Sequence, residues 1–273
     1  NFEPLKPYYQ YMNTPEKGAT MKEIRKAEKD FSLTAAGKLF SSSKKPVEEL
    51  YDIKTDPNEI NNLASDSKYL SRIKLMRKVM SNWQSSIGDI GLIPEAEIEI
   101  QEKRSGSRFE IMNGEESDLH HIQKLVSVAT KASEGISALD DLISASTSND
   151  PVIRYWAMTG IGNIGKNAGE VAKKISIDAM KDDSPSVRIA AARAVAKFGE
   201  IDSALGLLKN ELKSPHQWAR LATAIVIDEM GEDARPLVND LKKVLKIRQP
   251  NKYIIRVANR ALNDLLGTEN QVR

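Results

Sequence analysis

The sequence predicts a mostly α-helical chain in which a small mixed α and β segment precedes a solenoid of helical hairpins. In the second half, arginines recur at spacings of 34, 32 and 36 residues. In the first half, apolar residues recur every three or four positions through residues 69–87, as in one face of a helix. Residues 49–53 alternate, with Leu50 and Tyr51 on opposite faces, which is typical of a β-strand.

Length and composition limit the possible classes of protein. The chain has 273 residues, enough for two ordinary domains, and 40% of them are hydrophobic. Lys and Arg number 40 against 38 Asp and Glu, so the charge balance does not call for nucleic acid or an anionic membrane as partner. Without cysteine there are no disulfides, thiolate zinc sites or cysteine nucleophiles. No apolar run has the length of a membrane helix.

The first 46 residues predict short elements. Prolines and aromatic residues in 1–12 favour an extended edge segment. Residues 20–28 predict a helix with Thr20 as its N-cap, and residues 33–40 predict a second helix capped by Thr34. Residues 41–46 are a loop.

The next elements are a strand, a turn and a long helix. The strand over 49–53 leads to a turn at Asp56-Pro57, where Asp bonds its own backbone and Pro fixes φ. Asp66-Ser67 caps a helix over 67–87, which Gly88 ends. The apolar face of this helix consists of Tyr69, Ile73, Met76, Met80, Trp83 and Ile87.

Several of these motifs resemble the C-terminal part of formylglycine-dependent sulfatases of the heparan and N-sulfoglucosamine type. They are E-L-Y-D at 49–52, D-P-N-E at 56–59, N-L-A at 62–64 and the run from Gly88 to Glu95. The resemblance implies a small antiparallel sheet with a packed helix, closing one side of a catalytic domain. It also implies an exported bacterial parent that hydrolyses sulfate esters or sulfamates on a glycan.

The chemistry of that family is expected outside this chain. The family's C-x-P-x-R or S-x-P-x-R motif for formylglycine is absent, and Ser184-Pro185-Ser186-Val187-Arg188 has its proline one place too early. Calcium and formylglycine are therefore expected in a missing N-terminal domain. The chain itself is expected to have no catalytic or metal-binding residues, and Lys6, Tyr8 and Lys45 are weak candidates for contacting substrate.

The sequence divides into residues 1–104, a linker over 105–117 and a repeat region over 118–273. Asn1-Phe2-Glu3 is not a natural start, so we expect a piece of a longer protein. Glu95, Glu97, Glu99 and Glu102 are expected to be a solvated connector.

The repeat region shows one pattern four times. Each of Arg154, Arg188, Arg220 and Arg256 is followed eleven residues later by a glycine: Gly165, Gly199, Gly231 and Gly267. Each is preceded by a proline, with Asp150, Ser184, Ser214 or Gln249 before it. Asp or Ser as N-cap, Pro at the first helical position and Gly beyond the end define a helix.

A second helix follows each of the first three, near 168–181, 201–213 and 233–247, with apolar stripes such as Leu205, Leu208 and Leu212. The pattern resembles HEAT repeats, with residues 118–146 as a degenerate first hairpin and repeats beginning near 150, 184, 214 and 249.

Functional alternatives exist for several of these residues. The repeated arginines could form a row that binds a ligand. We favour the interpretation that they form hydrogen bonds with helix carbonyls or with acidic partners along the solenoid. Trp156, Trp218 and Tyr155 are a sugar-stacking surface or, as we favour, packing residues. His120, His121 and His216 are poor candidates for a metal site, since neighbours on a helix do not share a face.

A basic region near the C-terminus is either a surface for a sulfated polysaccharide or a solvated helix face. It consists of Lys242, Lys243, Lys246, Arg248, Lys252, Arg256 and Arg260.

The leading hypothesis is an accessory region of a sulfatase that serves packing, substrate access or assembly. Its partners are the parent catalytic domain and a sulfated polysaccharide or a protein. The second hypothesis is a stand-alone HEAT scaffold. DNA binding by a basic groove is disfavoured, because the repeats lack basic clusters.

Overall fold

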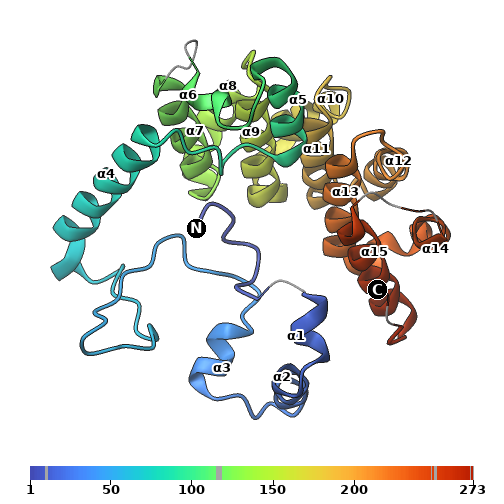
Figure 1. Ribbon diagram of the computed structural model, residues 1–273, viewed down its shortest axis with the longest axis horizontal. Coiled ribbons are helices and arrows are strands. Elements are labelled where there is room, and N and C mark those ends of the chain that lie inside the picture. The colour runs from blue at the N-terminus through green and yellow to red at the C-terminus, as the bar shows by residue number, and fades with distance from the viewer. Residues whose placement is uncertain (10–11, 115–118, 247, 249–250, 271, 273) are drawn as a thin grey trace. The chain divides into compact units, whose positions relative to one another are not determined.

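The computed structural model describes residues 1–9, 12–114, 119–246, 248, 251–270 and 272 (Figure 1). The chain forms two compact units, Asn1–Trp83 and Gln84–Arg273. This division lies within the first predicted segment, 1–104. The long helix α4, Leu70–Ser86, runs across it.

The first unit contains short helices joined by long connections: α1 (Asn13–Lys17), α2 (Ala19–Lys29), α3 (Ala35–Phe40), the 3₁₀ turn η1 (Ser67–Tyr69) and the start of α4. Thr34 caps α3 as predicted, since its hydroxyl accepts a hydrogen bond from the Gly37 amide at 3.1 Å. The N-cap of α2 is Gly18, so the prediction of Thr20 as that cap is wrong. Asp66 caps η1 through the Lys68 amide.

The predicted antiparallel strands are wrong for the residues that the structure describes, none of which is in a strand. Residues 49–53 are irregular, and the amide of Leu63 donates to the carbonyl of Leu50 at 2.8 Å. The other hydrogen bonds of this pairing go to the side chain of Asn62. A side chain that occupies the backbone groups replaces a ladder, so a sheet does not extend from here.

The described residues of the second unit form helices joined by loops. It contains α5 (Glu95–Ser105), α6 (Glu110–Asn113), α7 (Leu119–Lys131), η2 (Gly135–Ala138), α8 (Leu139–Ala145), α9 (Pro151–Ile164), η3 (Gly165–Ala168), α10 (Gly169–Ala179), α11 (Pro185–Phe198), α12 (Ile201–Glu211), α13 (Gln217–Met230), η4 (Gly231–Leu237), α14 (Val238–Lys246) and α15 (Lys252–Leu266). The predicted linker 105–117 includes α6 and its buried Met112. Residues 115–117 lie outside the described part.

Helix starts and ends follow the predicted pattern in most repeats. Asp150 and Ser184 accept hydrogen bonds from the amides of Val152 and Val187, at 2.8 and 3.2 Å, with Pro at the first helical position of each helix. The third repeat differs, because α13 begins two residues after Pro215 and Ser214 instead bonds the amide of His216. Asn251 caps α15, while Gln249 and Pro250 lie outside the described residues.

All four repeat glycines, Gly165, Gly199, Gly231 and Gly267, have positive φ, between 56 and 96°. This confirms their role as helix terminators.

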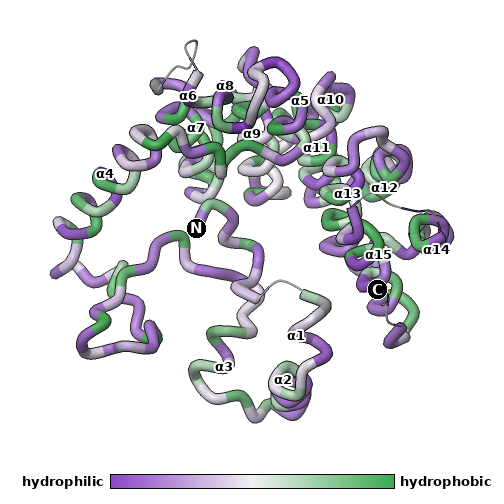
Figure 2. Tube along the Cα trace, viewed as in Figure 1, coloured by the Kyte–Doolittle hydropathy of each residue, from purple (hydrophilic) through white to green (hydrophobic). Residues whose placement is uncertain are grey.

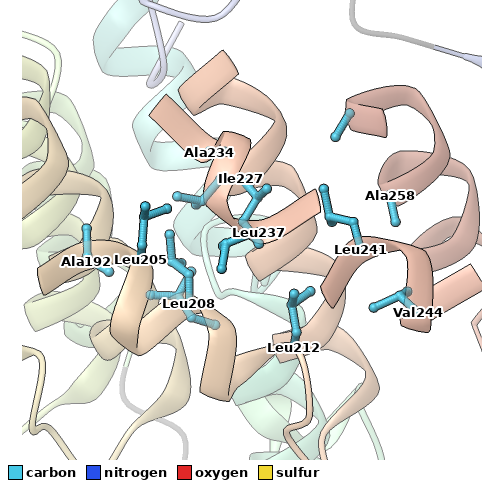
Figure 3. Packing of buried hydrophobic residues seen from close by; sticks show 14 of the residues in the cluster. Ala192, Leu205, Leu208, Leu212, Ile227, Ala234, Leu237, Leu241, Val244 and Ala258 are labelled. Atoms are coloured by element: carbon cyan, nitrogen blue, oxygen red, sulfur yellow. The ribbon is translucent and has the colours of Figure 1, made fainter. Parts of the chain in front are cut away.

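The helices stack in two layers. Helices α7, α9, α11, α13 and α15 pack side by side, and α8, α10, α12 and α14 form the second layer. Figure 3 shows Leu205 and Leu208 of α12 beside Ile227 and Leu237 of the next repeat, with Leu241 and Val244 continuing the same apolar cluster. Figure 2 shows apolar residues recurring along the stacked helices, alternating with hydrophilic ones. The predicted α-solenoid is therefore confirmed.

No described helix combines the length and the apolar character that crossing a membrane requires.

Candidate functional site

The motif at residues 46–64 forms a loop that is held by one asparagine. The Oδ1 atom of Asn62 accepts hydrogen bonds from the amides of Leu50 and Ala64, both at 3.0 Å. Its Nδ2 atom donates to the carbonyl of Glu48 at 3.0 Å. The predicted turn at Asp56 is confirmed, because the Glu59 amide donates to the Asp56 carbonyl at 3.1 Å. The Asp56 carboxylate also accepts from the Asn61 amide at 2.7 Å. The motif residues are therefore occupied in shaping the loop.

The same loop is tied to α4 by an ion pair. Arg77 Nε and Nη2 donate to the two carboxylate oxygens of Glu48, at 2.8 and 2.7 Å. These hydrogen bonds lower the pKa of Glu48, so the pair stays charged at neutral pH. An exposed pair of this kind contributes little stability, but its two-pronged geometry fixes orientation.

Beside that loop lies a polar group that we name the Glu49 cluster: Asn1, Tyr8, Glu49 and Tyr51. The hydroxyl of Tyr51 donates to Glu49 Oε2 at 2.8 Å, and the Asn1 side chain donates to the other oxygen. Burial acts to raise the pKa of Glu49, but the hydrogen bonds from Asn1, Tyr51 and Tyr8 outweigh it and the pKa is lowered. Burial and Glu49 together raise the pKa of Tyr51, so its proton stays in place.

The three substrate candidates have different surroundings. Tyr8 belongs to the Glu49 cluster. Lys6 pairs with Glu3 at 2.7 Å, and the backbone amide of Lys45 donates to the carbonyl of Pro4 at 2.8 Å. Their assignment as substrate contacts stays a prediction.

Helix α4 presents an apolar stripe to solvent, which we name the α4 stripe. Its members are between 45% and 62% exposed: Leu70, Leu75, Met76, Val79, Met80, Trp83 and, just beyond the helix, Ile87. Isolated apolar residues at a surface are normal, whereas a contiguous stripe of this size marks an interaction surface.

The repeated arginines are held within the solenoid. Arg154 donates to both oxygens of Asp182, at 2.7 and 2.8 Å, and to the carbonyl of Ser148. Arg188 donates to Glu211 and to the carbonyl of Asp182, each at 2.8 Å. Arg220 donates to the carbonyl of Ser214. For these three arginines the favoured interpretation is confirmed: each satisfies a carbonyl six residues earlier, between two hairpins.

A second polar line crosses the first layer of helices, and sequence reasoning missed it. Arg193 is 6% exposed and donates to both carboxylate oxygens of Glu229, at 2.8 Å each. It also donates to Asn163 Oδ1 at 2.9 Å, and Asn163 donates to the carbonyl of Ala132. Lys197 adds a second cation near Glu229 at 3.2 Å. The signal in the sequence was Arg193, a charged residue among the alanines of α11.

The stretch expected to be a solvated connector is in fact packed on the solenoid. Glu97 is 3% exposed, and Ser184 Oγ donates to its Oε1 atom at 2.6 Å. Trp156 Nε1 donates to the carbonyl of Leu92 at 2.8 Å, and Leu92 and Ile93 are buried. The connector interpretation is therefore wrong for Glu97, while packing is confirmed for Trp156. The segment docks here because its two buried acceptors, the Leu92 carbonyl and the Glu97 carboxylate, each receive a hydrogen bond from the solenoid.

These contacts also explain the near-miss motif at 184–188. Ser184 caps α11 and donates to Glu97, so its hydroxyl is engaged both as an acceptor and as a donor. Arg188 holds Glu211 and two loop carbonyls. The local sequence serves the junction between repeats.

The histidines lie apart from any set of three metal ligands within the described residues. His121 Nε2 lies 3.3 Å from Asp150 Oδ2, and His120 Nδ1 lies 3.4 Å from Gln123 Oε1. His216 stands at the N-cap position of α13, where its side chain makes no capping bond.

Comparison with known proteins gives similarities to a repeat family, to an enzyme and to a solved structure. A family profile for HEAT repeats matches residues 139–227. The ulvan-active sulfatase of Formosa agariphila is 33% identical over 98 residues, which is 36% of this chain and 16% of that enzyme. The crystal structure of an engineered protein shares 16% identity at a TM-score of 0.41, over 75% of this chain and 94% of its own. That score does not establish a common fold.

Proposed function

We propose that this chain is an accessory, C-terminal region of an exported sulfatase that acts on a sulfated glycan. The observation that carries the proposal is the 33% identity to a sulfatase over 98 residues. The order of the motifs at 49–52, 56–59, 62–64 and 88–95 supports it. Because the chain spans 16% of that relative, the activity belongs to the proposal and not to what has been observed.

In this proposal, residues outside the chain supply the formylglycine nucleophile and hold calcium for the sulfate group. The chain's own contribution is structural. The α4 stripe packs against the catalytic domain, since burying apolar surface stabilises by roughly 25 cal/mol per Å². The hydrogen-bonded loop at 48–64 and the Glu48–Arg77 pair orient that helix.

The HEAT unit has a different role in this proposal. The run from Gly88 to Glu95 resembles the end of the sulfatase tail, and the carbonyl of Leu92 within it accepts a hydrogen bond from Trp156 of the solenoid. In the proposal the solenoid serves to shape substrate access or to mediate assembly.

The test compares this chain with a longer protein that includes the residues encoded upstream of Asn1. We expect purified 1–273 to leave an aryl sulfate intact and the longer protein to hydrolyse it. Replacing Met76 and Met80 by Asp in the longer protein is expected to lower its unfolding midpoint. The new carboxylates would be buried against the apolar surface of the catalytic domain, which is unfavourable. Lys74→Asp, on the polar side of α4, is the control. Turnover by the fragment alone refutes the proposal.

The HEAT match over 139–227 also supports a second function, a protein-binding scaffold without a sulfatase domain. The upstream sequence discriminates between the two. A C-x-P-x-R or S-x-P-x-R motif there supports the sulfatase, and its absence from the whole gene supports the scaffold.

A further inference from the structure

The last two helices, α14 and α15, carry a concentration of positive charge. From Leu241 to Asn263 there are seven Lys and Arg residues and no Asp or Glu, in a chain of net charge +2. Lys242, Lys243, Lys246 and Lys252 are exposed. Helices α14 and α15, which carry them, pack against each other.

The fourth repeat arginine differs from the other three. Arg154 and Arg188 hold carboxylates and Arg220 holds a carbonyl, whereas Arg256 lies with its guanidinium carbon 5.5 Å from the ring centre of Tyr253. Lys252 Nζ lies 6.0 Å from the same ring, which is 52% exposed. Among the described residues, the buried Nε atom of Arg256 has no hydrogen-bond partner. An exposed aromatic ring is thus flanked by two cations.

The charges of this surface are not compensated within the described part of the chain. Lys243 is near Asp240, at 3.4 Å, and Arg260 pairs with Asp228, but Lys242, Lys246, Lys252 and Arg256 form no ion pair there. Lys242 and Lys246 stand four residues apart on one helix, as do Lys252 and Arg256 on the next, and like charges at this spacing repel. The first turn of α15 has the cation Lys252 and no acidic residue, which opposes the helix dipole. A bound polyanion offsets the repulsion within both pairs of cations and the unfavourable interaction with the helix dipole.

We infer that Lys242, Lys246, Lys252, Tyr253 and Arg256 form a binding surface for a sulfated polysaccharide, which we name the α14–α15 surface. Sulfate groups are permanently charged acceptors for Lys and Arg, and an exposed tyrosine ring offers a flat apolar face to a sugar ring. This inference rests on the proposed function, which supplies sulfate as the anion. Duplex DNA fits less well, because the arginines of the earlier repeats are already paired and a duplex needs phosphate contacts along its length.

The experiment measures binding of heparin, as a sulfated probe, to the full 273-residue chain by isothermal titration calorimetry at low and at raised salt. We expect heparin to bind, chemically desulfated heparin to bind at least tenfold more weakly, and salt to weaken the heparin complex. The triple variant Lys242→Glu, Lys246→Glu, Lys252→Glu is expected to lose about tenfold or more in affinity, which corresponds to about 1.4 kcal/mol. Tyr253→Ala is expected to weaken binding without changing the net charge.

The matched control reverses three exposed lysines elsewhere in the solenoid: Lys166→Glu, Lys174→Glu and Lys181→Glu. Equal loss in both triple variants means general attraction to net charge and overturns the inference. Absence of heparin binding, equal affinity for desulfated heparin, or tighter binding of duplex DNA also overturns it. Circular dichroism of each variant checks that it is folded. Sulfate release by the longer protein is measured separately, so an active sulfatase without heparin binding refutes the α14–α15 surface alone.

Discussion

At the scale of single residues, the repeat pattern is explained by backbone geometry. Gly199 has φ of 96°, in the left-handed region, and its amide donates to the carbonyl of Ala196 at 2.9 Å. A residue with a Cβ atom is strained in that region, so glycine is required there whatever the surroundings.

Gly199→Ala is expected to lower the free energy of unfolding by about 1 kcal/mol, because Ala disfavours positive φ. Gly206→Ala is the matched control. Gly206 lies inside α12, and an added Cβ there has open space, so Ala is expected to stabilise by about 0.5–1 kcal/mol. Urea unfolding of both variants measures the two effects, and an unchanged midpoint for Gly199→Ala contradicts the capping assignment.

Two neighbouring acids on α13 respond to their surroundings in opposite directions. Burial alone favours the protonated form of both. For Glu229, the hydrogen bonds and charge of Arg193 and the charge of Lys197 outweigh burial, and its pKa falls to about 2. For Asp228, burial dominates, Arg260 offsets part of it, and repulsion from Asp264 and Glu229 adds to it, so its pKa rises to about 6. The number of positive partners decides the difference.

The lowered pKa of Glu229 predicts acid sensitivity. Because the folded pKa lies below the ordinary value of 4.5, ionised Glu229 stabilises the fold above pH 4.5, and this contribution is lost as the pH falls toward 2. It amounts to roughly 3 kcal/mol. We expect the difference in unfolding free energy between the native chain and Glu229→Gln to shrink as the pH falls from 6 to 3. A difference that does not depend on pH contradicts the assignment.

At the scale of elements, helices were predictable and their partners were not. Thr34, Asp150 and Ser184 cap helices as their sequence positions indicate, because capping is local. The α4 stripe was visible as a periodic pattern, but its exposure was not, since periodicity marks a face without saying what covers it. Alternation at 49–53 predicted a strand. The side chain of Asn62, which is distant in sequence, instead takes up the backbone amide of Leu50 and the carbonyl of Glu48.

The docking of α5 is the element that the sequence concealed most. Glu97 belongs to a run of alternating glutamates that has the composition of a solvated helix. It is buried because Ser184, 87 residues later, brings a hydroxyl to it. A contact between residues so distant in the chain leaves no local pattern.

Glu97→Ala is expected to destabilise the second unit by about 1–3 kcal/mol, because it leaves a buried hydroxyl at Ser184 without its acceptor. Glu95→Ala, on the exposed side of the same helix, is the control and is expected to cost less. Thermal unfolding measures both. Equal effects of the two substitutions contradict the claim that α5 is held by this bond.

At the scale of the whole molecule, the solenoid depends on neighbours. Each hairpin buries one apolar set against the next, as Leu208 does beside Leu237 (Figure 3). Polar contacts add to this: Arg154 reaches the loop before the next repeat, Arg193 reaches Glu229 in the next repeat, and Arg188 joins the two helices of its own repeat through Glu211. Repeats built in this way stabilise one another and have little stability alone.

The sequence by itself determined the helices, the repeat and the ends of each repeat, because caps, prolines and left-handed glycines act on their own backbone within a few residues. It also carried the resemblance to a sulfatase. Tertiary structure decided which charges are available. Arg154 is paired with Asp182 in the next loop, Arg188 is paired with Glu211 of α12, and Glu97 is buried, while Arg256 lies against Tyr253. These outcomes depend on which distant residues meet, and only folding brings them together.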